Sequence, residues 1–389
     1  MTLAFAFLSM LLSLFSEEAT IVFAGDAMQH QVQLDNARRA DGTYSYTDCF
    51  EKIAPWVTQA DYAVVNLETT LGQGGFTGYP CFCSPDSYAR ALRDAGFDLF
   101  LTANNHTLDR RDRGLRRTAA MLDSLGVDHI GTYTDARQRS ERLPLIKDIK
   151  GFKVAFLNYT YGTNGIKIQG DVVVDYIDRQ RIAADIKACR RAGAELVIVM
   201  PHWGIEYQLI NDASQRALAR HMLESGADAV IGGHPHVIQP MKMTASEADN
   251  LGRRPVVYSM GNFISGMRTE PTRGGAMVQL TLSRGADGRA RIKDGSYRLV
   301  FTLPGTPGKQ GHRLIFVDED TDIAAEAGAM APQCRAFTRS ALGIFGKHNV
   351  DFPRYEPHDD PLGLDDVLRL IINELGTYSR MCTQTDRRI

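Results

Sequence analysis

Residue types that bind metal ions recur in this sequence directly after short apolar runs. Carboxylate oxygens, imidazole nitrogens and amide oxygens are the usual protein ligands of divalent ions such as Mg, Mn, Fe and Zn. If the side chains that follow the runs meet in space, they supply the ligands of a metal site. The candidate ligands are Asp26, Glu68, Asn105, His202, His234 and His236.

The apolar runs predict the strands that position these side chains. Continuous apolar runs of four to six residues are typical of strands buried on both faces. Open α/β sheets bind ligands at the carboxyl ends of their strands, so the polar clusters should share one edge. The runs and the clusters that follow them are Thr20–Ala24 with Gly25-Asp26, Tyr62–Val65 with Asn66-Leu67-Glu68, Asp98–Ala103 with Asn104-Asn105-His106, Glu195–Met200 with Pro201-His202-Trp203-Gly204, Asp228–Gly232 with Gly233-His234-Pro235-His236, and Pro255–Ser259 with Met260-Gly261-Asn262-Phe263.

Helical segments alternate with these strands. Ser84, with proline after it, predicts a helix N-cap, and Asp212 predicts another. The alternation indicates a parallel sheet with helical crossovers. After Asn262 the pattern changes to antiparallel strands at Gly275–Leu282 and Tyr297–Phe301. Four helices are expected. One follows Ser84 and is closed by Gly96. The others are Arg113–Leu125, ended by Gly126, Asp178–Ala192, ended by Gly193, and a helix that Asp212 caps, which runs through Leu223 and ends near Gly226.

Composition narrows the class of protein. The 389 residues carry a formal net charge of −2, which gives no reason to expect nucleic acid as a partner. No stretch reaches the roughly 20 apolar residues of a membrane span. Thr2–Phe15 has the length of a signal-peptide core or short anchor, although no Lys or Arg precedes Arg38. We therefore expect an extracytoplasmic protein, periplasmic, cell-surface or anchored. A buried first strand or a misassigned start would leave it cytoplasmic.

The predicted organisation has three parts. Residues 1–18 form the signal peptide or anchor, 19–318 the main domain, and 319–389 a partly helical C-terminal extension that includes an amphipathic helix at Leu364–Leu375. The six cysteines show no zinc-type spacing, and Cys189 fits the apolar face of a helix. They do not settle the redox compartment.

Single clusters support particular roles. His106 could donate a proton or stabilise an oxyanion, and Asp109, three residues on, could orient its ring. The alternative is a turn that caps the next helix. Asn66 and Glu68 point the same way on one strand end, which suits Glu68 to bridge two ions. His202 could instead be a structural histidine.

The paired histidines are the strongest local signal. His234 and His236 flank one residue, and Gly232-Gly233 before them permits a tight turn that lets both face a metal. A basic stretch between Arg110 and Arg117 is either a solvated helix face or an anion-attracting wall near the site.

Taken in order, the motifs resemble the CapA, or poly-γ-glutamate capsule biosynthesis, family. The matching stretches are FAGDAMQH, DYAVVNLETTL, GFDLFLTANNHTLDRRDRGL, VIVMPHWGIEY, GADAVIGGHPHVIQP and VYSMGNF, within residues 20–265. The resemblance implies the α/β fold of calcineurin-like metallophosphoesterases. That fold is a four-layer α/β/β/α sandwich of mixed sheets, here with a C-terminal extension.

The resemblance also implies a role for each residue. Two divalent ions, Mn, Fe, Zn or Mg, would be bound. Asp26 and His236 would hold the first ion. Asn105, His202 and His234 would hold the second, with Glu68 between the two. His106 would be the acid, while Asn66, Asp109, Glu206 and Asn262 would support the ligands. Two positions depart from the phosphoesterase pattern: Met28 replaces a histidine, which His30 could compensate, and Glu68 replaces an aspartate.

The resemblance implies a function in making, exporting or anchoring an extracellular polymer through a metal-dependent, hydrolase-like site. The expected partners are an anionic polymer or phosphoester substrate and membrane-bound synthesis or export machinery. A plain metal-dependent phosphoesterase and a non-catalytic polymer-binding subunit are the alternatives. A fold of this type does not by itself name a reaction.

Overall fold

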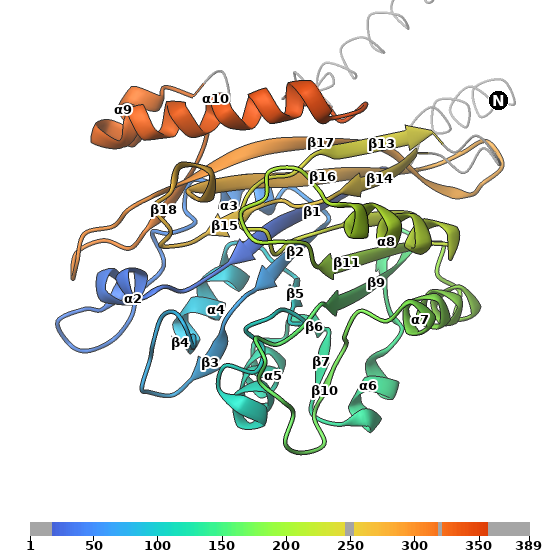
Figure 1. Ribbon diagram of the computed structural model, residues 1–389, viewed down its shortest axis with the longest axis horizontal. Helices are drawn as coiled ribbons and strands as arrows, with labels where there is room; N and C mark the ends of the chain where they lie inside the picture. Colours follow the sequence, from blue (N-terminus) through green and yellow to red (C-terminus); the bar gives the residue numbers. More distant parts are fainter. Residues whose placement is uncertain (1–17, 246–252, 318–320, 357–389) are drawn as a thin grey trace, which may run out of the picture. The chain divides into compact units, whose positions relative to one another are not determined.

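The computed structural model describes residues 18–245, 253–317 and 321–356 (Figure 1). The described residues up to Pro353 belong to one compact unit. The division into residues 1–18, 19–318 and 319–389 stays a prediction. Two expectations, the signal peptide or anchor at Thr2–Phe15 and the helix at Leu364–Leu375, lie outside the described residues. In the part of the chain that is described, no helix is both long and apolar enough to cross a membrane.

The first sheet carries the N-terminal half of the site. Its strand order is β18-β17-β16-β1-β2-β5-β6, and β15 pairs with the end of β1. β1 runs parallel to β2 and antiparallel to β16, so the sheet is mixed. Its strands are β1 (Glu18–Ala27), β2 (Tyr62–Leu67), β5 (Leu99–Leu101), β6 (Asp128–Ile130), β15 (Asn262–Ile264), β16 (Gly274–Arg284), β17 (Ala290–Leu303) and β18 (Arg313–Phe316).

The second sheet carries the histidines. Its order is β13-β14-β12-β11-β9-β8. β9, β11, β12 and β14 are parallel, while β8 and β13 are antiparallel edges. Its strands are β8 (Leu145–Ile149), β9 (Phe152–Thr160), β11 (Leu196–His202), β12 (Ala229–Ile231), β13 (Met241–Ala245) and β14 (Arg253–Val257).

The two sheets pack face to face over one apolar core. Phe23 and Val64 of the first sheet belong to the same buried cluster as Phe156 and Ile198 of the second. The rings of Tyr62 and Phe156 stack across the interface with centroids 5.3 Å apart. Burial of these two faces is the main force that holds the sheets together, and it thereby brings the strand ends of both sheets close to one another.

Helices cover the outer faces. On the second sheet, alternate strand residues pack with Ile182 and Ile186 of α7 (Arg179–Arg191) and Met222 of α8 (Ala213–Glu224), which Figure 1 shows beside β9 and β11. The expected α/β/β/α order of layers is confirmed. The other α-helices are α2 (Gln31–Ala37), α3 (Ala54–Val57), α4 (Asp86–Asp94), α5 (Arg111–Leu125), α6 (Ala136–Arg142), α9 (Ile323–Ala327) and α10 (Ala331–His348).

Local signals set most helix ends as predicted. Asp212 accepts a hydrogen bond from the Gln215 backbone at 2.8 Å and caps α8, and Gly126 ends α5 in the left-handed region. The N-cap predicted at Ser84 is wrong. Pro85 is the N-cap of α4, because the Ser84 hydroxyl is held at 2.7 Å by Thr69 across the small sheet of β3 (Thr70–Gly72) and β4 (Cys83–Pro85).

The C-terminal part of the compact unit completes the core. Phe337 and Phe345 of α10 pack on Phe301 and Tyr297 of β17, so this helix extends the apolar cluster between the sheets. A further two-stranded sheet joins β7 (Thr132–Tyr133) to β10 (Val173–Val174). Cys189 of α7 is fully buried, as expected for a core residue.

Candidate metal centre

All six candidate ligands gather where the parallel strands of the two sheets end. Asp26 in β1 lies opposite Asn66 of β2 on one side and Asn262 of β15 on the other. His202, the last residue of β11, pairs with Gly233 after β12. Each of the six side chains belongs to a residue that is at most 2% exposed. The predicted convergence is thus present in the structure, while the roles of these residues as ligands stay predictions.

One group of ligand atoms centres on the two carboxylates. His236 Nδ1 lies 3.3 Å from Asp26 Oδ2, and His236 Nε2 lies 3.8 Å from Glu68 Oε1. The three residues each offer one atom within 4.8 Å of the others, a spread that suits a shared ion. Glu206, His234 and His236 form a second group of the same size.

His202 and Asn105 extend the cluster on its other side. His202 Nε2 lies 2.8 Å from Asn105 Oδ1 and 3.6 Å from Glu68 Oε1. The rings of His202 and His234 have centroids 4.8 Å apart. Glu68 therefore lies between the two sets of ligands that the family resemblance assigns.

The polar atoms left unpaired in the cluster fit a cation. Glu68 Oε1 and His234 Nδ1 are buried and have no hydrogen-bond partner among the described residues. A buried polar atom without a partner costs free energy, which a bound cation would offset. Because the donors are carboxylate, imidazole and amide, the residues present fit a divalent ion such as Mn, Fe, Zn or Mg.

Burial also puts the imidazoles in the form that binds metal. Burial, followed by the neighbouring His234, lowers the pKa of His202 well below its usual value. Burial and then the charge of His236 lower the pKa of His234 to about 3. Burial and the nearby Asp26 raise the pKa of Glu68 well above its usual value. Neutral imidazoles keep a lone pair for coordination, and a cation would favour the ionised form of Glu68.

The backbone at the paired histidines is shaped for close approach. A Cβ on Gly233 would lie 2.9 Å from Asp26 Oδ1, so glycine lets the two segments meet. His234 and His236 have φ values of 103° and 58°, in the left-handed region. The His234 backbone N–H donates to Asp26 Oδ2 at 3.2 Å and helps to hold this conformation.

His106 and Asp109 form a separate buried pair beside the cluster. His106 Nδ1 lies 2.8 Å from Asp109 Oδ2, and the same oxygen accepts from the Phe82 backbone N–H at 2.6 Å. The helix-capping alternative does not hold, because α5 has Arg110 at its N-cap and no side-chain cap. With Nδ1 held by the carboxylate, Nε2 is the ring nitrogen left for chemistry.

The residues predicted to support the ligands have distinct contacts. Asn66 donates to Asp26 Oδ1 at 2.8 Å and to Glu68 Oε2 at 3.3 Å, so it spaces the two carboxylates. Asn262 places its Oδ1 3.1 Å from His236 Nδ1. Glu206 is exposed, and its grouping with His234 and His236 makes it a candidate ligand at the mouth of the site rather than a support alone.

Several residues at the site were not singled out from the sequence. Tyr161, 47% exposed, follows β9 and lies over His234 with ring centroids 4.4 Å apart. Asn164 in the same loop accepts from Asn105 Nδ2 at 3.2 Å. Asn104 donates to Asn66 Oδ1 at 3.1 Å. These residues follow β9, whose apolar run Val154–Leu157 is shorter than the strand because Asn158 interrupts it, so the sequence signal at this strand end is weaker than at the other six.

The other candidates lie nearby with different partners. His30 Nδ1 accepts from the Gly266 backbone N–H at 3.2 Å, and His30 is in neither metal-binding group of the described residues. Of the basic stretch, Arg116 pairs with Asp171 and Arg117 with Asp86 at 2.5 Å. These pairs favour the solvated-face interpretation.

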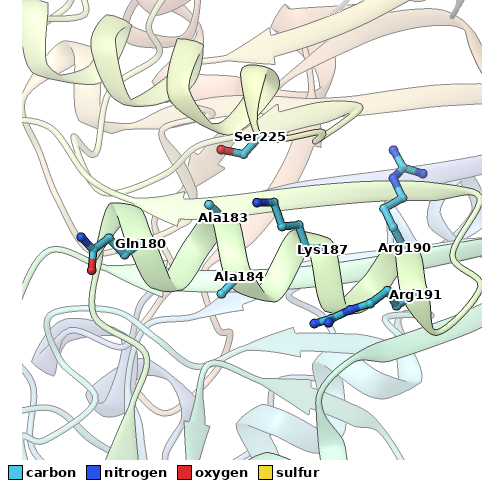
Figure 2. A pocket seen from close by; sticks show the side chains of 7 residues that line it. All are labelled: Gln180, Ala183, Ala184, Lys187, Arg190, Arg191 and Ser225. Carbon is cyan, nitrogen blue, oxygen red and sulfur yellow. The ribbon is translucent and has the colours of Figure 1, made fainter.

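A larger hollow lies elsewhere on the surface. It has a volume of about 670 Å³ and runs along α7, and Figure 2 shows the side chains that line it. Lys187 and Arg191 among them are exposed. Arg190 is already engaged by the Gly226 carbonyl and Asp228. None of its lining residues belongs to the metal cluster, so we place the chemistry at the strand ends.

Comparison of the sequence with known proteins finds relatives among bacterial capsule and PGA biosynthesis proteins. The chain is 24% identical over 284 residues to the capsule biosynthesis protein CapA of Bacillus anthracis, covering 69% of this chain and 64% of that protein. It is 27% identical over 282 residues to the PGA biosynthesis protein CapA of Bacillus subtilis, covering 69% of each. The chain thus spans about two thirds of the length of these relatives.

Among solved structures, the chain matches the calcineurin-like phosphoesterase YfkN from Bacillus subtilis at 13% identity and a TM-score of 0.42, covering 84% of this chain and 98% of that one. The family model of the bacterial capsule synthesis protein PGA_cap matches residues 20–267, more than half of the chain and every one of the predicted site residues. The chain therefore belongs to the PGA_cap family of bacterial capsule synthesis proteins.

Proposed function

We propose that the protein acts in the synthesis or export of an extracellular acidic polymer, with a divalent-metal site of hydrolase type. One observation carries the proposal: Asp26, Glu68 and His236 offer ligand atoms within 4.8 Å of one another, and Glu68 Oε1 is buried without a hydrogen-bond partner among the described residues. The names of the two relatives, capsule and PGA biosynthesis proteins, support the polymer.

The residues of the site would either bind the ions or position the side chains that bind them. Asp26, His236 and Glu68 would hold one ion, and Asn105, His202, His234 and Glu68 a second, with Glu206 at the mouth. Bound divalent ions lower the pKa of water and neutralise developing negative charge. Asn66 keeps the carboxylates apart through its two hydrogen bonds, and Asn262 orients the His236 ring.

His106 handles the proton in this proposal. Asp109 fixes His106 Nδ1 and stabilises the protonated ring, so Nε2 can give its proton to a leaving group. Tyr161 and Tyr207, both about half exposed, lie against His234 and His236 and would shield the substrate from water. The substrate is an ester or amide of the polymer, or a phosphoester.

Removal of metal tests the proposal directly. Protein treated with a chelator should lose hydrolysis of γ-linked glutamate polymer and of model phosphodiesters, and one of Mn, Fe, Zn or Mg should restore it. Metal analysis of the untreated protein should find up to two ions per chain. Hydrolysis that is unaffected by the chelator would contradict a metal-dependent reaction. Metal without turnover of any substrate would favour the polymer-binding subunit.

We also propose that the protein works outside the cytoplasm, where an exported polymer and its membrane-bound machinery meet. The apolar segment Thr2–Phe15 supports this location. Cell fractionation should find the protein in the periplasm, at the surface or with the membrane, and mass spectrometry should show the N-terminal segment removed or embedded. Full-length protein that retains Met1 in the cytosol would rule this location out.

A further inference from the structure

A hollow beside the metal centre has the lining of an anion-binding site. It has a volume of about 240 Å³, on the order of eight times the ~30 Å³ that one water occupies in the liquid. Two arginines, Arg268 and Arg273, line it together with Thr302 and His312. The two arginines come from the segment after β15, Thr302 from the end of β17, and His312 lies directly before β18.

Both arginines lack a carboxylate partner among the residues that the structure describes. Arg273 Nε donates to the Arg268 carbonyl oxygen at 2.7 Å, and neither guanidinium forms an ion pair within the described residues. The two like charges are close enough that burial and Arg268 together lower the pKa of Arg273. A bound oxyanion would relieve this repulsion and accept charge-assisted hydrogen bonds from both guanidinium groups.

A buried hydroxyl and an imidazole supply further donors. Thr302 is 5% exposed, and its Oγ1 has no hydrogen-bond partner among the described residues. His312 is also 5% exposed, and Asn36 Nδ2 lies 3.3 Å from its Nδ1, which leaves Nε2 as the protonated nitrogen. An unpaired buried hydroxyl is unfavourable unless a ligand completes its bonding.

The hollow is connected to the metal centre through Asn262. This side chain holds His236 Nδ1 with its oxygen, at 3.1 Å. Its Nδ2 donates to the Thr272 carbonyl at 2.9 Å, directly before Arg273. Gly266, which lines the hollow, donates to His30 Nδ1 at 3.2 Å. The segment that carries the arginines is therefore fixed to a candidate metal ligand.

We propose that this hollow is an oxyanion subsite, in which Arg268, Arg273 and Thr302 bind a carboxylate of the acidic polymer next to the unit held at the metal centre. The identity of the polymer rests on the proposed function, whereas the anion site rests on the side chains alone. A free phosphate presents the same oxyanion chemistry, so the experiment must separate the two sources.

Calorimetric titration of the full-length, metal-loaded protein tests the subsite. The probes are a tetramer of γ-linked glutamate and inorganic phosphate. Arg268→Gln with Arg273→Gln should weaken binding of the tetramer roughly ten- to hundredfold, the usual effect of losing a charge-assisted bond. Thr302→Val, nearly the same in shape, should weaken it roughly two- to tenfold and should not lower the temperature of thermal unfolding, because it removes an unpaired buried hydroxyl. Arg137→Gln on α6, whose charge lies on an exposed helix, is the matched control.

The outcomes separate this inference from the proposed function. Weaker binding of the tetramer alone identifies the polymer as the ligand, and equal weakening of phosphate binding identifies a general oxyanion site. Arginine variants that bind both probes as tightly as Arg137→Gln would overturn the subsite, even if the wild-type protein hydrolyses polymer. Conversely, weaker binding with unchanged metal content in a protein without turnover would keep the subsite and reject the hydrolase.

Discussion

Replacing His106 with alanine is expected to lower turnover by roughly 10²- to 10⁴-fold, the usual contribution of a positioned acid or base. The metal content should stay near that of the wild type. The reason is geometric: His106 Nδ1 is 2.8 Å from Asp109 Oδ2, and His106 belongs to neither metal-binding group of the described residues. Turnover of polymer and metal content per chain are the two measurements.

Two comparison variants make this result specific. Asp109→Asn should lower turnover in the same direction but less, because it removes only the charge that orients and stabilises the His106 ring. His221→Ala removes a histidine from α8, outside the site, and should change neither measurement. If His106→Ala strips the metal, His106 is a ligand and its assigned role is wrong. If it changes neither metal content nor capsule formation in cells, the site is not catalytic.

The strand ends of the site were predictable from the sequence because strands buried on both faces need continuous apolar runs. Asp26 and His202 each end such a run, and both lie at the edge where the sheets bind ligands. This prediction does not depend on which strands are neighbours, because it uses only the position of each polar residue at the end of an apolar run. The sequence alone therefore indicates all six candidate ligands.

The parts that were not predicted depend on contacts between distant segments. Asn158 interrupts the apolar run of β9, yet it is buried because it holds the Ala103 backbone N–H at 2.7 Å and the Met200 carbonyl at 2.8 Å. Ser84 has the residue type of a cap, but its hydroxyl bonds across a small sheet instead. Neither partner is visible in a local pattern, and tertiary contacts decide both cases.

The residues that line pockets also depend on contacts that the sequence does not reveal. Glu206 follows His202 by four residues and reads as a supporting residue, but the turn after β11 brings it to His234 and His236. The hollow at Arg268 joins residues from separate strands, and no spacing in the sequence links them. Local sequence patterns therefore indicate which residues lie at the edge of a sheet. They do not indicate which residues from distant segments line a pocket.

Replacing His234 with alanine is expected to lower metal content and thermal stability together. Ligand binding to the folded state stabilises it, by about 2.7 kcal/mol when free metal is at 100 times its dissociation constant. A site that has lost one imidazole binds less tightly, so this contribution shrinks and the melting temperature should fall by several degrees. Metal analysis and thermal unfolding, each in the presence of added metal, measure the two effects.

Chelated protein supplies the decisive control for His234. The His234 ring is buried, its Nδ1 has no hydrogen-bond partner among the described residues, and burial keeps it neutral. Without metal the imidazole therefore contributes little polar bonding, and the difference in melting temperature between wild type and His234→Ala should shrink when a chelator is present. Alanine keeps a Cβ, so the left-handed backbone at this position is strained in both proteins. A difference of the same size with and without metal would show that His234 supports the fold by packing, and that it is not a metal ligand.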